Sequence, residues 1–532
     1  MADLASKSYK PVVLLVLDGF GVPQTPESTV FMAKRPAFEN LEKFFPFTTL
    51  QASGVAVGLP WGEEGNSEVG HLTMGAGKVL YHHLPRIIVS IQDGSFFKNE
   101  GLLKAASHVQ KFASALHFMG LFSSGSVHAY PDHLYALLEF AKREGISKVY
   151  LHLFTDGRDA ASKEAGTFLK ELELRLSANY PFAKIASLVG RDFAMDRDEH
   201  WNNIARSYNL LTRGEGASFQ NAVDYVAGEY VAGRSDEFVE PGWLKGPDGK
   251  AEGRIKEGDA VVFLNYREDS ARELTRAFAE ESFDKFAREK ISNLLFLTMT
   301  EYEKNLPAEA LFPPLEVDWP LARALSERGL SQLHVAETEK YAHVTYFFNG
   351  GRERPYPKEE RILIPSLPGA HFDETPEMSA AKITETVLDG LSKYDFILAN
   401  FANADMVGHT GNFEATVKAI EVLDFSVGKI MPKVLESGGV LIITGDHGNA
   451  EEKRYRLTGE KKTKHTINPV PLFLVAEDFR ASSAKNPAEI LKRYEEVGGV
   501  LTDIAPTILE LMQIPRPVEM SGVSLVSKLL RK

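Results

Sequence analysis

Residues 12–21 read VVLLVLDGFG, and this stretch decides the class of fold. The six apolar residues 12–17 predict a strand that is buried on both faces, as in a parallel sheet covered by helices. Asp18 and Gly19 follow at once, so a carboxylate lies at the carboxyl end of the strand. Ligands bind at that end of the strands in open α/β sheets, and Asp18 is therefore the first candidate site residue.

Similar apolar runs recur along the chain and alternate with segments whose apolar residues repeat at helical spacing. The alternation predicts an α/β fold with sheets covered by helices on both faces. The predicted strands are 12–17, 115–122, 149–154, 185–189, 260–264, 294–297, 396–401, 440–444 and 471–475. The predicted helices are 133–143, 163–176, 200–211, 270–278, 381–391 and 413–430. Residues 233–258, rich in Gly, Pro and charge, predict a surface excursion or hairpin.

The composition excludes several classes of function. The chain has 532 residues, too many for one core, so at least two domains are expected. Its 60 Lys and Arg against 73 Asp and Glu give a net charge of −13, which argues against nucleic-acid and anionic-membrane partners. No apolar run approaches the roughly 20 residues of a membrane helix, and the start lacks a signal-peptide pattern, so we expect a cytoplasmic enzyme. Without Cys, a metal ion must be held by carboxylates, imidazoles, hydroxyls or backbone oxygens.

A first group of motifs carries carboxylates and imidazoles. It comprises Asp18, Ser67 in GNSEVGHLTMGAG, Asp405 and His409 in ADMVGHTGN, Asp446 and His447 in TGDHGNAE, and His465 in KHTINPVP. Asp405 and His409 are four residues apart, so on a helical turn they share a face and can chelate one ion. Imidazole with carboxylate suits Mn²⁺, Zn²⁺ or Co²⁺, and the set is large enough for two ions. Two such ions activate a nucleophile for phosphoryl displacement, and Ser67 is the candidate nucleophile. The alternative is structural: each motif taken alone is also consistent with a turn or a strand–loop junction.

A second group of motifs is basic. It comprises His128 in GSVHAY, Arg158 and Asp159 in TDGRD, Arg191 and Arg197 in GRDFAMDRD, and Arg267 in NYRED. Arginine binds phosphate and carboxylate groups bidentately, so several converging arginines indicate a small substrate with more than one negative charge. Local salt bridges at helix starts are the alternative interpretation of DGRD and DRD.

The spacing of the motifs predicts a discontinuous domain. Ser67 and Asp405 are separated by 338 residues, far more than a loop, and the intervening segment contains most of the basic group. We expect residues 1–80 and 312–532 to form a metal-binding domain and residues 81–311 to form an inserted substrate-binding domain. Hinges are expected at residues 77–85 and 302–313, with the site in the cleft between the domains. His82 and His83 are interpreted as solvent-exposed hinge residues.

Together with KYAHVTYFFNGG (residues 340–351) and the tail LTDIAPTILELMQI, these motifs resemble the cofactor-independent (2,3-bisphosphoglycerate-independent) phosphoglycerate mutases, of the alkaline-phosphatase-like superfamily. The resemblance runs in family order from about residue 12 to residue 471. It implies two α/β domains, one of them a discontinuous alkaline-phosphatase-like domain. It also implies an isomerase of glycolysis and gluconeogenesis that interconverts 3-phosphoglycerate and 2-phosphoglycerate as a monomer. The implied mechanism uses a phosphoserine intermediate, no bisphosphoglycerate, and two divalent metal ions, typically Mn²⁺ and sometimes Co²⁺ or Zn²⁺.

The resemblance further implies a role for each matching residue. Ser67 matches the nucleophile that becomes phosphoserine. Asp405, His409 and His465 match one metal site. The other metal site is matched by Asp18, Ser67, Asp446 and His447. The substrate-binding positions are matched by His128, Arg158, Asp159, Arg191, Arg197, Arg267 and Lys340.

The chain departs from the family pattern at three places. Ser270 stands where many members carry a second arginine, and Arg272 would lie about 200° round a helix from it. We therefore expect that the set of arginines binding the phosphate or carboxylate of the substrate either lacks one guanidinium group or is completed by a residue from elsewhere in the chain. Ser124 stands where an Asp is common, and residues 160–162 read Ala-Ala-Ser where prolines are common. The alternative functions are a metal-dependent phosphomonoesterase or a phosphopentomutase on the same scaffold, and an inactive homologue that acts as a metal-dependent binding protein.

Overall fold

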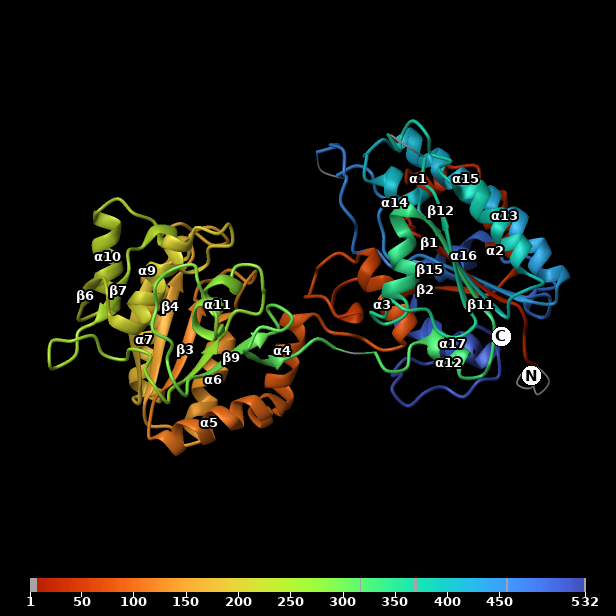
Figure 1. The fold of residues 1–532 in the computed structure, drawn as a ribbon. Helices are drawn as coiled ribbons and strands as arrows, with labels where there is room; N and C mark the ends of the chain where they lie inside the picture. Colours follow the sequence, from red (N-terminus) through yellow and green to blue (C-terminus); the bar gives the residue numbers. More distant parts are fainter. Residues whose placement is uncertain (1–6, 316, 368–370, 456–457, 531–532) are drawn as a thin grey trace. The chain divides into compact units, whose positions relative to one another are not determined.

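The structure is a computed structural model that describes residues 7–315, 317–367, 371–455 and 458–530. It confirms the α/β class: the described residues form two eight-stranded sheets, one in each of two compact units (Figure 1). The first unit comprises Met1–His82 and Leu315–Lys532, and the second comprises His83–Pro314. No helix in the described part of the chain is both long enough and apolar enough to cross a bilayer.

The sheet of the first unit has the order β12-β11-β13-β1-β14-β15-β2-β16. Its strands are β1 (Val12–Leu17), β2 (Phe47–Gln51), β11 (Gln332–Glu337), β12 (Glu359–Ile364), β13 (Phe396–Phe401), β14 (Val440–Thr444), β15 (Val470–Val475) and β16 (Val497–Val500). Strand β1 is parallel to both of its neighbours, β13 and β14, whereas β15 pairs antiparallel with β14. Every residue of β1 is buried, as its continuous apolar run predicts.

Two cores enclose β1, one on each face of the sheet. The helices of this unit are α1 (Thr29–Met32), α2 (Pro36–Phe44), α3 (Ser67–Ala76), α12 (Leu321–Ser326), α13 (Ala380–Gly390), α14 (Asn403–Gly408), α15 (Phe413–Glu436), α16 (Pro487–Glu495), α17 (Ile504–Leu511) and α18 (Val526–Leu530). Val12, Leu14 and Val16 pack with residues of α12 and α17, while the intervening residues of β1 pack with α2, α13 and α15. Figure 1 shows α12 and α17 on one side of this sheet and α13 and α15 on the other. The alternation explains why no polar residue interrupts the strand.

The sheet of the second unit has the order β10-β9-β8-β3-β4-β5-β7-β6. Its strands are β3 (Leu116–Leu121), β4 (Val149–Thr155), β5 (Ala183–Gly190), β6 (Ala217–Phe219), β7 (Gly242–Leu244), β8 (Ala260–Phe263), β9 (Leu295–Thr300) and β10 (Glu309–Phe312). Its helices are α4 (His83–Asp93), α5 (Glu100–Phe112), α6 (Pro131–Arg143), α7 (Ala165–Asn179), α8 (Arg191–Ala194), α9 (Trp201–Arg213), α10 (Ala222–Val231) and α11 (Arg272–Ala279). Among the described residues, the strands of this sheet pair in parallel except for β7 with β5.

The nine predicted strands and six predicted helices all coincide with observed elements, with ends shifted by a few residues. The prediction for residues 233–258 is wrong in part, because strand β7 of this segment belongs to the sheet. Asp236 in the same segment is buried and accepts hydrogen bonds from the backbone N–H groups of Glu164 and Ala165 at 2.8 and 3.0 Å. The second predicted hinge, 302–313, contains strand β10 and ends one residue before the limit of its unit.

We expect Leu398→Ala, in the middle of β13, to destabilise the first unit by about 2–5 kcal/mol, because it removes a fully buried side chain and leaves a cavity. Leu363→Ala, the same change at a position 44% exposed on β12, is the matched control and should cost much less. Hydrogen exchange of peptides from β1 and β13 measures the opening free energy of this unit separately from the other. Equal effects of the two substitutions would contradict the placement of β13 in the core.

Candidate active site

Three carboxylates meet at the carboxyl edge of the first sheet. Asp18 follows β1, Asp405 lies in α14 directly after β13, and Asp446 comes two residues after β14. These three strands are neighbours, so the positions predicted at strand ends lie side by side. All three residues are buried, with at most 2% of their surface exposed. This edge of the sheet therefore concentrates negative charge away from water.

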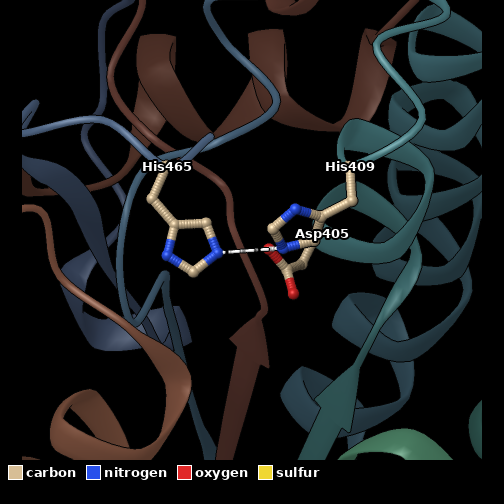
Figure 2. A group of neighbouring side chains, drawn as sticks. All are labelled: Asp405, His409 and His465. Atoms are coloured by element: carbon tan, nitrogen blue, oxygen red, sulfur yellow. Dashed lines mark hydrogen bonds and ion pairs between the residues drawn. The ribbon is translucent and has the colours of Figure 1, made fainter. Parts of the chain in front are cut away.

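Two imidazoles face Asp405 (Figure 2). The Nε2 atoms of His409 and His465 each lie 3.3 Å from Asp405 Oδ1 and 3.0 Å from each other. Each Nδ1 instead points to a backbone carbonyl, that of Thr463 for His409 and that of Gly65 for His465. A carbonyl only accepts hydrogen bonds, so each Nδ1 carries a hydrogen, and Nε2 is the nitrogen whose lone pair can bind a cation when the ring is neutral. The three groups thus offer three converging donor atoms to a cation.

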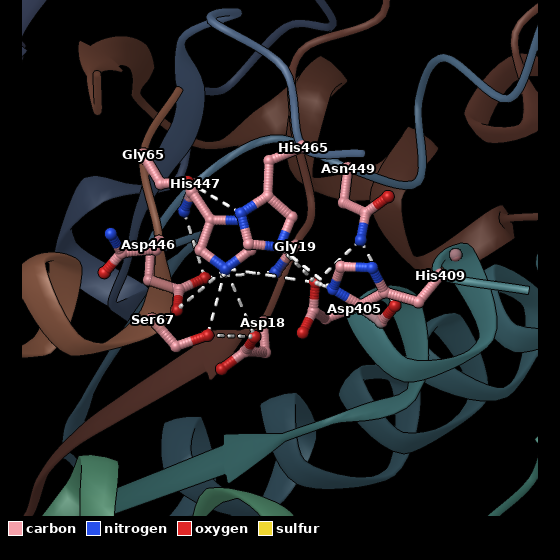
Figure 3. A network of polar contacts seen from close by, with 12 residues as sticks. Asp18, Gly19, Gly65, Ser67, Asp405, His409, Asp446, His447, Asn449 and His465 are labelled. Atoms are coloured by element: carbon pink, nitrogen blue, oxygen red, sulfur yellow. Dashed lines mark hydrogen bonds and ion pairs between the residues drawn. The ribbon is translucent and has the colours of Figure 1, made fainter. Parts of the chain in front are cut away.

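A second group of side chains surrounds His447 (Figure 3). Its Nε2 lies 3.0 Å from Ser67 Oγ, 3.5 Å from Asp18 Oδ1 and 3.6 Å from Asp446 Oδ2. The Ser67 hydroxyl donates to Asp18 Oδ1 at 3.0 Å. Asp405 Oδ1 is also only 3.9 Å from His447 Nε2, so Asp405 joins the two groups. The family resemblance implies Asp405 for only one metal site, the one with His409 and His465.

Lys340 lies inside this cluster. Its Nζ is 2.6 Å from Asp18 Oδ1, 2.6 Å from Asp405 Oδ2 and 2.8 Å from Ser67 Oγ, and the residue is 4% exposed. The short 3₁₀ turn Thr338–Lys340 that follows β11 carries it to the same sheet edge. The resemblance had placed Lys340 among the substrate-binding positions, and the structure places its ammonium against the candidate nucleophile.

The charges in the cluster stabilise one another. Burial alone would raise the pKa of Asp18 and Asp405, but the ammonium of Lys340 and the neighbouring imidazoles hold both well below the usual range. Burial alone would lower the pKa of Lys340, which the two carboxylates raise above its ordinary value. Burial opposes the charged form of His447 as well, but Asp446, Asp18 and Asp405 raise its pKa to about 10. The carboxylates are therefore anions at neutral pH and available to bind cations.

The donor set fits divalent metal ions. Three groups of ligand atoms within 4.8 Å of one another occur among the described residues: Asp405, His409 and His465; Asp18, Asp405 and His447; and Asp18, His71 and Asp446. Asp446 Oδ2 is buried and accepts no hydrogen bond in the described structure. A buried carboxylate oxygen without a donor is unfavourable, and a cation beside it would compensate for the missing hydrogen bonds. Nitrogen and oxygen ligands together suit Mn²⁺, Co²⁺ or Zn²⁺.

Ser67 is the first residue of helix α3, which rules out the alternative that its glycine-rich segment is only a tight turn. The Asn66 side chain caps this helix by accepting a hydrogen bond from the Val69 N–H at 2.9 Å. The N-terminus of a helix carries partial positive charge, so this position favours an anionic oxygen or a phosphoryl group at Ser67.

Further polar residues that the sequence did not predict contact this site, among them His71 and Asn400. His71 lies one turn after Ser67, is fully buried, and places Nδ1 2.8 Å from the Ser67 carbonyl oxygen. Asn400, in β13, donates from Nδ2 to Asp18 Oδ2 at 2.7 Å and lies 3.0 Å from His71 Nε2. The four-residue spacing from Ser67 to His71 was an available signal, because it places both on one face of a helix.

Most of the basic group gathers at the carboxyl edge of the second sheet. Arg191 is buried, and its Nη1 lies 2.6 Å from both Asp156 Oδ1 and Asp159 Oδ2, while its Nη2 is 3.2 Å from His128 Nε2. Asp269 links this cluster to Arg197 at 2.7 Å and Arg267 at 3.0 Å, and lies 3.7 Å from His128 Nδ1. Asp156 and Asp269 were not predicted as members. Burial, reinforced by Arg191, lowers the pKa of His128 to about 4, so the imidazole is neutral.

The Arg158 side chain does not join these residues. Its Nε donates to Glu237 Oε1 at 2.8 Å, and only its backbone N–H reaches the cluster, through Asp156 Oδ1 at 3.1 Å. The Arg158 side chain therefore pairs with a residue 79 positions away in the sequence, which is not the local salt bridge at a helix start of the alternative interpretation.

The departures from the family pattern are visible around the same sheet edge. Ser270 is 3% exposed, and the Arg272 Nε donates to the Tyr302 carbonyl at 2.8 Å, so Arg272 does not supply the guanidinium that Ser270 lacks. Ser124 donates from its hydroxyl to Glu164 at 2.9 Å. In the first predicted hinge, His82 is exposed as expected, whereas His83 is half-buried at the start of α4.

Comparisons with known proteins bear on this arrangement. A family model described as the N-terminus of BPG-independent PGAM matches residues 87–304. A 2,3-bisphosphoglycerate-independent phosphoglycerate mutase of Moorella thermoacetica is 44% identical over 98% of this chain and 99% of the relative. The enzyme of the same name from Clostridium botulinum (strain Langeland) is 46% identical over 98% of this chain and its own full length. A crystal structure of Leishmania mexicana phosphoglycerate mutase at low cobalt concentration is 30% identical, covers 97% of this chain and 98% of its own, and has a TM-score of 0.52.

We predict that metal binding to the metal-free protein releases at least one proton at pH 8, because a cation at His447 Nε2 must displace a proton held with a pKa of about 10. The pKa of His447 is raised above its ordinary value of 6.5, so protonation of this imidazole stabilises the metal-free fold. This contribution to the free energy of unfolding is fully present below pH 6.5 and is lost as the pH rises through about 10. Metal affinity should therefore rise about tenfold per pH unit across this window. Titration calorimetry in buffers of different ionisation enthalpy measures the proton count. His200→Asn, at an exposed histidine of the second unit, is the control, and a pH-independent affinity would contradict the prediction.

Proposed function

The chain belongs to the family of 2,3-bisphosphoglycerate-independent phosphoglycerate mutases, and from this premise we propose how its own residues interconvert 3-phosphoglycerate and 2-phosphoglycerate. Ser67 takes the phosphoryl group from one hydroxyl oxygen of the substrate and returns it to the other. In the first step the Ser67 Oγ–P bond forms as the glycerate O–P bond breaks, and the serine hydrogen ends on the glycerate oxygen. The second step reverses this exchange at the neighbouring hydroxyl and restores the serine.

The observation that carries this proposal is the set of contacts around Ser67 Oγ. Asp18 Oδ1 accepts its hydrogen at 3.0 Å, which orients the lone pairs of the hydroxyl. Lys340 Nζ, 2.8 Å away, stabilises negative charge that develops on the serine oxygen and on the transferred group. The N-terminus of α3 acts in the same sense. A surface serine would have none of these three features.

We propose two divalent ions at this sheet edge, Mn²⁺ first, with Co²⁺ or Zn²⁺ as substitutes. Asp405, His409 and His465 would hold one ion, and Asp18, Ser67, Asp446 and His447 would hold the other. Support comes from the converging donor atoms, from the buried Asp446 Oδ2 that accepts no hydrogen bond in the described structure, and from the cobalt named for the Leishmania relative. When bound, such ions lower the pKa of a serine hydroxyl and stabilise the oxygens of an in-line displacement.

The second unit is proposed to be the substrate-binding domain, with the first unit as the metal-binding domain. His128, Asp159, Arg191, Arg197 and Arg267 would bind the glycerate and its carboxylate, and Arg158 would join them on the family pattern alone. Arg197 and Arg267 already share the carboxylate of Asp269, so a substrate carboxylate would bind to the same guanidinium groups. The glycerate must stay bound between the two transfers, because water at that stage would turn transfer into hydrolysis.

We also propose that the enzyme acts in glycolysis and gluconeogenesis as a cytoplasmic monomer. A phosphomonoesterase or a phosphopentomutase would use the same serine and metal ligands. The arginines of the second unit favour phosphoglycerate over both, because its carboxylate gives them a second anionic group to bind. An inactive binding protein is disfavoured, since Ser67 and every proposed ligand are present in the sequence.

The test supplies 3-phosphoglycerate to protein loaded with Mn²⁺, omits 2,3-bisphosphoglycerate, and follows 2-phosphoglycerate and free phosphate together. We expect isomer without phosphate, and turnover about a thousandfold or more lower in Ser67→Ala, because that change removes the hydroxyl held between Asp18 and Lys340. Ser326→Ala, whose hydroxyl donates to the Pro357 carbonyl, is the matched control and should leave turnover unchanged. Phosphate without isomer would identify a phosphatase instead, and normal turnover of Ser67→Ala would exclude the serine mechanism.

A further inference from the structure

A buried lysine lies behind the first proposed metal site. Lys453 follows β14 in the motif TGDHGNAEEK and is 2% exposed. Its Nζ donates to the carbonyl of Gly408 at 3.0 Å and to Oδ1 of Asn449. Placing a lysine head group out of water is unfavourable unless its hydrogen bonds are replaced, so the burial calls for an explanation. The reaction described above makes no use of this residue.

Asn449 connects the lysine to Asp405. It is fully buried, and its Nδ2 donates to Asp405 Oδ1 at 2.7 Å (Figure 3). That oxygen is the one that His409 and His465 face at 3.3 Å each. The other oxygen of Asp405 accepts from Lys340. The two carboxylate oxygens therefore have different donors, which fixes the rotation of the Asp405 side chain.

The ammonium group determines which way the Asn449 amide points. An amide has a donor end and an acceptor end, and an ammonium group only donates. The oxygen of Asn449 must therefore face Lys453, and its NH₂ group must face Asp405. If the amide turned round, its oxygen would lie against the carboxylate of Asp405. Gly408 permits this packing, because a Cβ atom at that position would lie 2.9 Å from Asn449 Oδ1.

We propose that Lys453 is a positioning residue for the metal ion at Asp405, His409 and His465, and that it acts through Asn449. The inference rests on the metal site of the proposed function. Groups that orient metal ligands typically change metal affinity about 10–100-fold when they are removed. Simple electrostatics gives the opposite sign, because removing a positive charge near a cation site strengthens cation binding. The direction of the change therefore separates positioning from a charge effect.

The test measures Mn²⁺ binding to the metal-free full chain by competition with a chelating dye. Lys453→Met keeps the length of the side chain and removes the donor, and we expect one of the two ions to bind about 10–100-fold more weakly. Lys453→Arg, which retains a donor, should recover much of the loss. Lys462→Met is the matched control, since Lys462 is a nearby lysine whose Nζ pairs with Glu452 at 3.4 Å, and it should bind like the parent.

A double-mutant cycle tests the route through the amide. Asn449→Ala alone should weaken binding to the same extent, and adding Lys453→Met should weaken it no further, because both remove one function. Asn449→Ala and Lys453→Arg keep the proposal testable if Lys453→Met does not fold. Unchanged or tighter Mn²⁺ binding in Lys453→Met, or additive losses of Mn²⁺ affinity in the double variant, would overturn the positioning role of Lys453 and leave the proposed metal sites standing. A parent protein that binds no divalent ion would instead overturn the proposed metal sites, and this inference with them.

Discussion

The whole first unit depends on one electrostatic constraint: three carboxylates share a buried sheet edge. Asp18, Asp405 and Asp446 would repel one another there, and their burial is tolerable only with cations between them. Lys340 supplies one, within 2.6 Å of two of them. The charged form of His447 supplies a second in the metal-free state. One oxygen of Asp446 still accepts no hydrogen bond among the described residues, so there is a place for a further cation at this edge.

The strand order creates this constraint. With β1 between β13 and β14, the loops that follow all three strands leave the sheet at neighbouring positions. Gly19, at φ +71°, allows the first of these loops to pass close to α14, because a Cβ atom there would lie 2.8 Å from the Asp405 Cα. The second unit uses the same edge of its sheet: its strands β8, β3, β4 and β5 are neighbours, and the loops after them carry three arginines together with the aspartates that pair with them. In both units the functional candidates thus follow the carboxyl ends of neighbouring strands.

The sequence predicted the parts of the molecule where burial leaves a simple pattern. Central strand β1 is apolar throughout, β13 is apolar except for Asn400, and the charged residues that follow both strands lie where they were expected. Strand β11 was missed because Gln332 and His334 interrupt its apolar run; both are nevertheless buried, since they pair with the carbonyl groups of Ala322 and Val344. His71, Asn400 and Asn449 were missed because the partner of a polar side chain is set by tertiary structure. For the same reason the sequence did not predict the ion pair of Arg158, whose partner Glu237 is 79 residues away in the sequence.

We propose that the buried serine at this anionic edge carries the phosphoryl group between two positions of one substrate. The most direct measurement is rapid acid quenching of the metal-loaded protein during turnover of 3-phosphoglycerate that carries radioactive phosphorus, followed by peptide mapping. We expect radioactive phosphorus on the peptide containing Ser67. This phosphoserine should form at least as fast as 2-phosphoglycerate appears, and its phosphoryl group should then return to phosphoglycerate. Turnover with no covalent label, or with label on a different residue, would contradict it.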